Sequence, residues 1–210
     1  MQANRELEQY LSQLPGVGPR QAKRIIQALL RREPFFSRRL GELIQSVRQN
    51  MRVCEETFQY FYSEDQNETL SEIAKDPSRD HGKILVVESD SDLEAIEKTD
   101  LWRGTYFVLG GNLKPATNES SYDNFIRLNQ LNNLVTNKYQ NHTLSEVILG
   151  LSSSINGDFT ADIVRETVAE ISDSISISQL GRGLSTGTAL EYIDKNTFES
   201  ALEHRTTNTQ

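Results

Sequence analysis

Three apolar runs separated by segments of helical spacing constrain the fold of this chain more than any other feature. The runs lie at residues 84–87, 104–111 and 144–151. The segment "DLEAIE" follows the first run, "NFIRLNQLNNLVTNKY" precedes the third, and "INGDFTADIVRETVAEI" comes after it. Strands that alternate with helices in this way predict a parallel sheet with helices on its faces. We therefore expect an α/β domain over residues 81–175.

The flanking segments predict additional modules, so we expect an α+β chain of several parts. Residues 1–53 have helical spacing, whereas residues 54–80 are polar and acidic with no clear period. Residues 176–210 begin with a short strand in "ISISQ", continue through the Gly/Ser/Thr loop "GRGLSTG", and end in a helix from about Thr197. The aromatic residues of the central segment are expected to pack a small core: Phe58, Tyr60, Phe61 and Tyr62.

The stretch "LPGVGP" lies between two amphipathic segments, residues 6–14 and 20–30. Gly16 and Gly18 permit backbone conformations that other residues rarely adopt, and Pro19 suits the first turn of a helix, where its missing N–H costs nothing. This order predicts a helix-hairpin-helix. A third helix follows and is expected to pack on the first two through an apolar set at helical spacing: Phe36, Leu40, Leu43, Ile44 and Val47.

The hairpin predicts a phosphate-binding element. Backbone N–H groups at a hairpin and at a helix N-terminus form a site for anions, to which basic side chains add charge. Such contacts hold DNA phosphates without reading bases. The residues expected to contact DNA are Gly16, Val17, Gly18, Arg20, Lys23 and Arg24, with Arg38 and Arg39 of the third helix extending the path.

Three other interpretations of residues 14–32 compete with DNA binding. A nucleotide-binding loop would need a Lys-Ser/Thr pair after its last glycine and a strand before it, and the chain has neither. A helix that docks a protein partner stays open at this point, and so does a corner with a purely structural role.

Charge is divided unevenly along a chain whose net charge is −8. Residues 1–52 carry 10 Lys/Arg and 4 Asp/Glu, a net charge of +6, and residues 53–210 carry 12 Lys/Arg and 26 Asp/Glu, a net charge of −14. A basic module on an acidic body suggests local binding to a polyanion, because the acidic body discourages non-specific binding elsewhere. A solvated basic helix face without a ligand is the alternative.

Composition excludes several classes of protein. No apolar run approaches the roughly 18–20 residues that a membrane helix requires, and the N-terminal stretch lacks the apolar segment of a secretion signal, so we expect a cytoplasmic protein with no membrane partner. The single cysteine, Cys54, cannot form an internal disulfide. Cys54 and the distant His81 also cannot make a structural zinc site by themselves, because such a site needs four closely paired Cys/His ligands.

Five motifs in one order resemble the RecR family of bacterial recombination mediators. They are the "LPGVGP" hairpin, a small segment that carries a cysteine, the strand "ILVVES", the phrases "YFVLGGNLKP" and "EVILGLSSSINGDFTA", and the closing "GRGLSTGTALEYID". The resemblance covers nearly the whole chain. It identifies residues 81–175 as similar to a Toprim domain.

The resemblance implies a non-enzymatic clamp on DNA with no catalytic residue. Protomers of the family assemble into a ring, usually a tetramer, that acts with RecO and RecF to help load the RecA recombinase at gaps during DNA repair. We therefore expect DNA of any sequence, RecO and RecF as partners, and an association with the nucleoid when the protein is on DNA. A compact chain of 210 residues has a radius of gyration of about 17 Å, too small to enclose a duplex, so a clamp must be an oligomer.

Members of the family carry a zinc finger with two Cys-x-x-Cys pairs, and this chain departs from that pattern. Cys54 matches the first cysteine, Thr57 occupies the second position, and the later pair is absent. Residues 54–80 must then fold as a degenerate finger, with Cys54 as the only remnant of the zinc site. We expect no zinc, and aromatic residues in place of the metal as the organising centre.

The acidic residues of the Toprim-like part also depart from the catalytic pattern. Glu88 matches the family's first acidic residue, Asn156 stands where a glutamate is expected, and Asp158 follows two residues later. Catalytic Toprim enzymes resemble this architecture but add an Asp-x-Asp after a later strand, which "SSSINGD" lacks. The "DSD" at residues 90–92 is expected to begin a helix. Glu88 could hold a magnesium ion only weakly, so we expect no cofactor.

We expect Glu88, Asp90 and Asp158 to belong to an acidic surface that docks a basic partner such as RecO. A metal-dependent Toprim nuclease or phosphotransfer enzyme is the first alternative, although two or three carboxylates would be needed to hold a divalent cation against phosphate. An acidic scaffold that recruits a basic partner without binding DNA is the second alternative.

Overall fold

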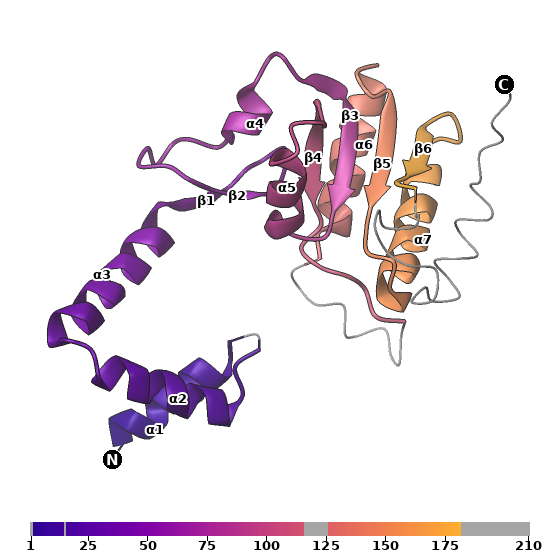
Figure 1. Cartoon of the computed structure of the whole chain (residues 1–210). Coiled ribbons are helices and arrows are strands. Elements are labelled where there is room, and N and C mark those ends of the chain that lie inside the picture. The colour runs from indigo at the N-terminus through magenta and orange to yellow at the C-terminus, as the bar shows by residue number, and fades with distance from the viewer. Residues whose placement is uncertain (1, 15, 116–125, 182–210) are drawn as a thin grey trace, which may run out of the picture. The chain divides into compact units, whose positions relative to one another are not determined.

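The computed structural model describes residues 2–14, 16–115 and 126–181 (Figure 1). The chain divides into two compact units. The first unit contains residues 1–51 and 62–67, and the second contains residues 52–61 together with the chain from residue 68 onward. Most of the degenerate finger therefore belongs to the same compact unit as the sheet.

Three helices form most of the first unit: α1 (Gln2–Ser12), α2 (Pro19–Leu30) and α3 (Pro34–Asn50). Helices α1 and α2 pack on each other, and Ala22 and Ile26 of α2 are buried. A tight turn joins these two helices, as the glycine-containing stretch predicts. The helix-hairpin-helix fold is therefore confirmed.

The expected packing of α3 on the first two helices is wrong. No residue of α3 is buried, and its apolar stripe, which consists of Phe36, Leu40, Leu43, Ile44 and Val47, is between 38% and 60% exposed. Helical spacing identifies the apolar face of a helix, but it does not say whether that face is covered within the chain or by another molecule. The α3 stripe is a hydrophobic surface of this unit.

Strand β1 (Met51–Val53) leads into the degenerate finger, which contains strand β2 (Tyr60–Tyr62) and a short helix, α4 (Glu72–Lys75). Strands β1 and β2 pair in a two-stranded sheet. The expected aromatic core is only partly correct. Tyr60 and Tyr62 are at least half exposed, whereas Phe58 packs against the main core of the second unit.

A four-stranded parallel sheet with the order β4-β3-β5-β6 forms the centre of the second unit. Strands and helices alternate along the chain, as predicted. They are β3 (Asp80–Val87), α5 (Asp90–Glu97), β4 (Gly104–Val108), α6 (Leu128–Gln140), β5 (Glu146–Gly150), α7 (Ile155–Ala169) and β6 (Ser176–Gln179). The short strand expected near the start of the C-terminal segment is β6, and it completes this sheet.

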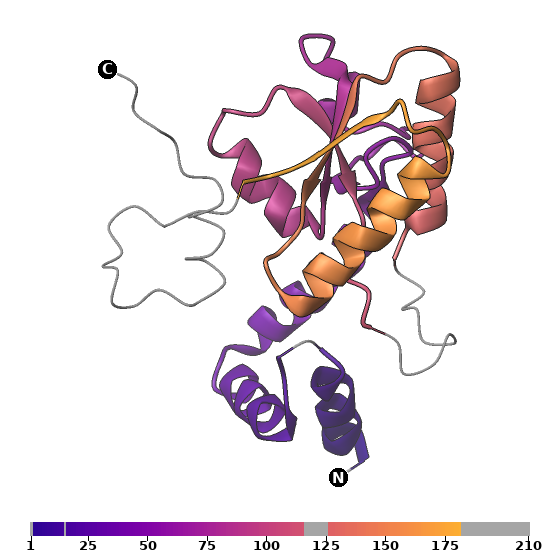
Figure 2. The ribbon, with the colours of Figure 1, turned by 90° about the vertical axis from the view of Figure 1, so that its right-hand side faces the viewer.

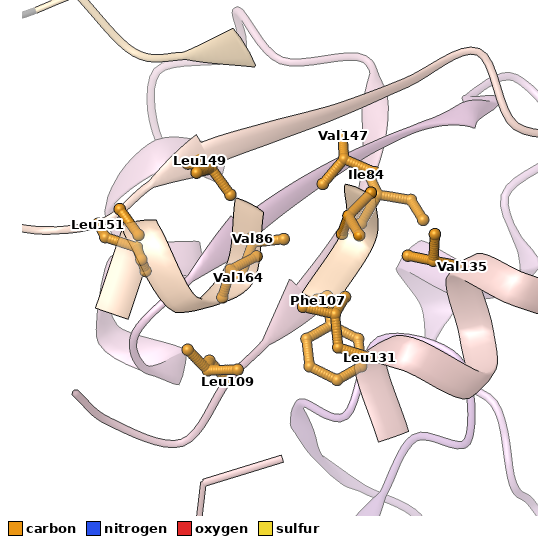
Figure 3. Close-up of a cluster of buried hydrophobic side chains, with 12 residues drawn as sticks. Ile84, Val86, Phe107, Leu109, Leu131, Val135, Val147, Leu149, Leu151 and Val164 are labelled. Atoms are coloured by element: carbon orange, nitrogen blue, oxygen red, sulfur yellow. The ribbon is translucent and has the colours of Figure 1, made fainter. Parts of the chain in front are cut away.

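Side chains of the central strand β3 alternate between the two faces of the sheet. Ile84 and Val86 pack with residues of α6 and α7 on one face (Figure 3), whereas Leu85 and Val87 pack with Leu93 of α5 on the other. Figures 1 and 2 show α5 on the face opposite α6 and α7. The chain crosses from β3 to β4 in one direction along the sheet and from β5 to β6 in the other. Right-handed connections therefore place α5 and α7 on opposite faces.

Two predictions concern parts of the chain that lie outside the described residues. They are the Gly/Ser/Thr loop after β6 and the helix expected from about Thr197.

The helix expected over residues 124–139 is present as α6, which begins at Leu128. Among the helices of the described ranges, none combines the length and hydropathy of a transmembrane span.

A charged network joins the start of the sheet to α5. The side chain of Arg79 is 8% exposed, and its guanidinium donates to both carboxylate oxygens of Glu97, at 3.0 and 2.5 Å. The Tyr106 hydroxyl also donates to Glu97, at 2.5 Å. Burial alone would raise the pKa of the Glu97 carboxyl, but these hydrogen bonds outweigh it and hold the pKa below its usual value. Glu97 thus neutralises a cation that the fold buries.

Glu97→Gln should destabilise the second unit by about 2 to 3 kcal/mol at neutral pH, because it removes the carboxylate that accepts two hydrogen bonds from the Arg79 guanidinium and leaves only Asp76, 3.5 Å from Nε, as a counter-charge. A lowered folded-state pKa gives a contribution that is fully present above the unfolded-state pKa, about 4.3, and is lost as the pH falls through the folded-state pKa. The difference in the free energy of unfolding between wild type and variant, measured by urea titration, should therefore shrink below about pH 4.

Glu94→Gln is the matched control, because Glu94 is exposed on the same helix. It should change the free energy of unfolding by less than about 0.5 kcal/mol at any of these pH values. If the two substitutions change the free energy of unfolding equally, the ion pair between Arg79 and Glu97 does not stabilise the unit. The same conclusion would follow if the loss of free energy caused by Glu97→Gln did not change with pH.

Candidate functional sites

A single glycine in a left-handed conformation forms the turn between α1 and α2. Gly16 has a φ of +76°, which other residues rarely adopt, and the Val17 N–H donates to the Leu14 carbonyl at 3.0 Å. The sequence suggested that Gly18 also adopts a backbone conformation that other residues rarely adopt, but it does not. Its φ of −79° is open to any residue, and a Cβ at this position would meet no atom within 4 Å. The fold therefore requires glycine at position 16 but not at position 18.

The first turn of α2 leaves backbone N–H groups without partners in the helix. Gly18 is the N-cap and has no side chain to accept them, and Pro19 has no N–H of its own. The Ala22 N–H donates to the Gly18 carbonyl at 2.9 Å and closes the first turn. The N–H groups of Arg20 and Gln21 consequently have no acceptor within the helix, which is the arrangement that favours an anion.

Three basic side chains lie near this helix N-terminus. Arg20, Lys23 and Arg24 are exposed, and the last two lie three and four positions after Arg20, so each shares a face of α2 with it. Lys23 pairs with Glu8 of α1, with 3.5 Å between Nζ and Oε1. Among the described residues, no carboxylate lies within 4.0 Å of the Arg20 or Arg24 guanidinium. The two arginines therefore carry the uncompensated charge of this face.

Arg38 and Arg39 lie on the exposed helix α3 of the same unit. Arg39 Nη1 donates to the Glu42 carboxylate at 3.2 Å. Arg38 has no ion pair within the part of the chain that the structure describes. Arg38 and Arg39 were both expected to extend the phosphate-binding path. Of the two, Arg38 is the one whose charge is not already paired with a carboxylate of the described residues.

The second candidate site lies at the carboxyl ends of β3 and β5. The chain leaves these neighbouring strands toward helices on opposite faces, a position where α/β sheets bind ligands. Glu88 follows β3, and its Oε1 accepts a hydrogen bond from the Ser152 N–H at 2.5 Å. Burial by itself would raise the pKa of Glu88, but hydrogen bonds from Ser152 and Asn112 outweigh it and lower the pKa. The Glu88 carboxylate therefore joins the loops that end two strands.

A second carboxylate, Asp158, lies in the first turn of α7, where the helix dipole favours an acid. Ser154 caps this helix by accepting the Gly157 N–H at 3.0 Å. A Cβ on Gly157 would lie 2.1 Å from the Ser152 carbonyl oxygen, so this glycine lets α7 approach the loop after β5. Across the described residues, no three His, Cys, Asp or Glu side chains gather in a group that could hold a metal ion.

The "DSD" stretch begins α5, as predicted. Ser89 is the N-cap, and its hydroxyl accepts the Asp92 N–H while the Asp92 carboxylate accepts the Ser89 N–H. Asp90 Oδ1 accepts the Tyr60 N–H at 2.6 Å. Asp90 thus connects the finger to the first turn of α5, a contact that sequence reasoning did not foresee.

Sequence reasoning also missed Asn112 and Ser152 beside Glu88. Asn112 Nδ2 donates to Ser152 Oγ at 3.4 Å. Both residues follow the carboxyl ends of parallel strands, so the rule that placed Glu88 at this edge could have identified them. No pattern in the sequence could have identified Arg127 as a functional neighbour of the finger, because its contact with Phe58 joins positions that are 69 residues apart.

Comparisons with known proteins assign the chain to a family. Residues 82–181 match the Toprim domain. Recombination protein RecR of Tropheryma whipplei (strain Twist) is 36% identical over 200 residues, which cover 95% of this chain and 94% of that protein. Recombination protein RecR of Legionella pneumophila (strain Philadelphia 1) is 32% identical over 98% of this chain and 96% of its own length.

A third relative, Recombination protein RecR of Chloroflexus aggregans, is 34% identical over 92% of this chain and 88% of its own length. Each of the three alignments covers 92% or more of this chain. The parallel sheet with its acidic residue after β3 agrees with the Toprim match. The chain therefore belongs to the RecR family of recombination proteins.

Proposed function

We propose that this protein acts in recombination and DNA repair as a non-enzymatic mediator that binds DNA without reading its sequence. The observation that carries the proposal is the N-terminus of α2, where the N–H groups of Arg20 and Gln21 lack acceptors in the helix and the exposed Arg20 and Arg24 add positive charge. Phosphate groups fit this combination, because the N–H groups supply directed donors and the arginines supply charge. The names of the relatives support the assignment to recombination.

A binding role fits the Toprim domain better than catalysis does. Phosphotransfer enzymes that use magnesium hold the ion with two or three carboxylates. Here Glu88 already accepts the Ser152 N–H, and Asn156 stands in place of a second acid. We therefore assign no catalytic residue, and at most a weakly held magnesium ion at Glu88.

The acidic second unit is proposed to dock a basic protein partner. The family resemblance suggests RecO, with RecF as a further partner, in a complex that helps to load RecA. Glu88, Asp90 and Asp158 follow strands or begin helices at one edge of the sheet, where a partner would meet their charge. The net charge of −14 beyond residue 52 would steer such a partner toward this unit.

Self-association is proposed to cover the α3 stripe. A hydrophobic surface on an otherwise polar helix is typical of a site of protein association. The stripe extends over three turns of α3, and Phe35 beside it is 70% exposed. A second copy of the same helix is the occupant we propose, as a step toward a ring of four protomers that encloses DNA.

Arg24→Glu should weaken binding to a short labelled duplex and reduce the salt dependence. Each phosphate contact that is lost should lower the slope of log K against log salt by roughly 0.9. Fluorescence anisotropy at a series of salt concentrations measures both quantities. Lys98→Glu, an equal charge change at the exposed end of α5, is the control and should leave the slope unchanged.

Gly18→Ala tests the backbone contribution in the same assay. Its Cβ would meet no atom within 4 Å, so it should cost no more than about 1 kcal/mol of stability at this N-cap position. The added methyl group should nevertheless weaken DNA binding, because it stands beside the N–H groups that we propose to hold phosphate. If Arg24→Glu leaves the slope of log K against log salt at its wild-type value, this face of α2 is not part of the DNA interface. If the wild-type protein itself binds no DNA, the alternative of an acidic scaffold is favoured.

Glu88→Gln separates docking from catalysis. The side chain keeps an oxygen that can accept the Ser152 N–H but loses its charge. We expect weaker binding to purified RecO in a titration, and no nicking of supercoiled plasmid by wild type or variant in magnesium. Magnesium-dependent nicking that Glu88→Gln abolishes would establish the nuclease alternative, and unchanged RecO affinity would remove Glu88 from the docking surface.

Ile44→Asp should reduce the mass of the protein in solution, measured by light scattering at micromolar concentration. Ile44 is 60% exposed at the centre of the α3 stripe, and a carboxylate buried in an apolar interface is costly. Gln45→Asp, one position away and also exposed, should keep the wild-type mass. A wild-type protein that is already monomeric would contradict both the interface and the ring.

A further inference from the structure

The only cysteine of the chain has its sulfur in a buried, hydrogen-bonded position. Cys54 is 0% exposed and directly follows β1. Its Sγ accepts the Thr57 N–H at 3.5 Å and the Ser71 N–H at 3.4 Å. The second contact joins two parts of the finger that are 17 residues apart in the sequence. The sulfur therefore lies where the two halves of the finger meet.

Three more residues of small volume are buried in the finger. Thr57 and Ser71 are each 1% exposed, and Ala74 is 6% exposed. Ser71 caps α4, because its Oγ accepts the Ala74 N–H at 3.3 Å. Two residues separate Cys54 from Thr57, and two separate Ser71 from Ala74. Together these residues reproduce the spacing of two Cys-x-x-Cys pairs, although only the first pair retains a cysteine.

These residues do not fit a zinc ion. A structural zinc site needs four thiolate or imidazole ligands in a tetrahedron. Only Cys54 supplies a thiol, and Ala74 has no donor atom in its side chain. The Thr57 hydroxyl donates to Gln59 Oε1 at 3.2 Å, and the Ser71 hydroxyl is used in the helix cap. The polar atoms at the site therefore bond to one another.

We propose that Cys54, Thr57, Ser71 and Ala74 are the four positions of a former zinc site, and that this finger folds without metal because hydrogen bonds to the Cys54 sulfur and docking on strand β4 replace the ion. Sequence reasoning assigned only the first two positions. The structure adds Ser71 and Ala74, because their spacing and burial place them as the second pair.

Docking on β4 gives the finger a support that is independent of metal. The Val108 N–H donates to the Thr57 carbonyl at 2.8 Å, and Arg127 Nη1 donates to the carbonyls of Phe58 and Val108, at 2.6 and 2.9 Å. The ring of Phe58 packs against Phe107, with 5.0 Å between the centroids. Since β4 is an edge strand, the finger also satisfies the Val108 N–H, a backbone group on the side of β4 that no other strand of the sheet covers.

The backbone of Phe58 shows how tightly this support holds the turn. Its φ of +56° is in the left-handed region, which costs a residue with a side chain roughly 1 to 2 kcal/mol. The Arg127 guanidinium holds the carbonyl of this residue and lies 5.8 Å from the centre of its ring. The turn after Thr57 is thus held by contacts with the sheet domain, where a metal-bound finger would rely on its ion.

The first test uses the wild-type protein. Purified from a zinc-supplemented culture, it should contain far less than one zinc ion per chain by elemental analysis. Its thermal unfolding midpoint should not change when a strong chelator is added. One zinc ion per chain, or a midpoint that the chelator lowers, would overturn the proposal whatever the variants do.

The second test restores the ligands. The triple variant Thr57→Cys, Ser71→Cys, Ala74→Cys should bind one Co²⁺ per chain, with the visible absorption of a tetrahedral thiolate site, and zinc should displace the cobalt and raise the unfolding midpoint. The control variant Thr57→Cys, Thr69→Cys, Glu72→Cys has the same number of cysteines and the same Cys-x-x-Cys spacing within each pair, but Thr69 and Glu72 are exposed.

The control variant should show no such spectrum at one equivalent of Co²⁺. Equal spectra from the two triple variants would show that the four buried positions are not specially placed. The absence of a tetrahedral spectrum in a folded Thr57→Cys, Ser71→Cys, Ala74→Cys protein would show that Ser71 and Ala74 are not the second pair. DNA binding is measured separately, so either result leaves the proposed function unaffected.

Discussion

The parallel pairing of β3 with β4 on one side and β5 on the other determines where the other parts of the second unit lie. A buried central strand must present apolar side chains to both faces, and Ile84 to Val87 do so in strict alternation. Because β3 and β5 lead to helices on opposite faces, their carboxyl ends form the one edge where Glu88, Asn112 and Ser152 can meet. The chemistry of the domain therefore follows from the strand order.

The same pairing makes β4 an edge strand, and the finger depends on that edge. Val108 donates through its N–H to Thr57 and accepts through its carbonyl from Arg127, so both backbone groups of one strand residue are used by contacts outside the sheet. A segment this small has too little apolar surface to fold by itself. Attachment to a preformed sheet provides the missing contacts, which explains how the finger can lose three of four expected ligands and still retain a defined turn.

The first unit depends on a different constraint, which is the balance between a small core and a large exposed surface. Only Ala22 and Ile26 are buried among its three helices. The apolar residues of α3 contribute nothing to that core and remain available to another protomer, while the arginines of α2 remain available to phosphate. Both proposed interactions of this unit thus use groups for which residues 2–14, 16–115 and 126–181 supply no charge partner or apolar cover.

The sequence by itself determined the N-terminal helices, the alternating strands and helices of the sheet domain, their order and the split in charge, because helical spacing, apolar runs and turn residues act over a few neighbouring positions. It did not predict β1, β2 or α4 in and beside the finger. It correctly indicated the hairpin, the parallel sheet and the acid after β3. Only the tertiary structure decided that Gly18 is not needed for the turn, that the α3 stripe is exposed, and that Arg127 and Ser71 complete the finger. These features depend on contacts between residues that are distant in the sequence, or on whether another described element covers a helix face. Patterns among neighbouring residues predict neither.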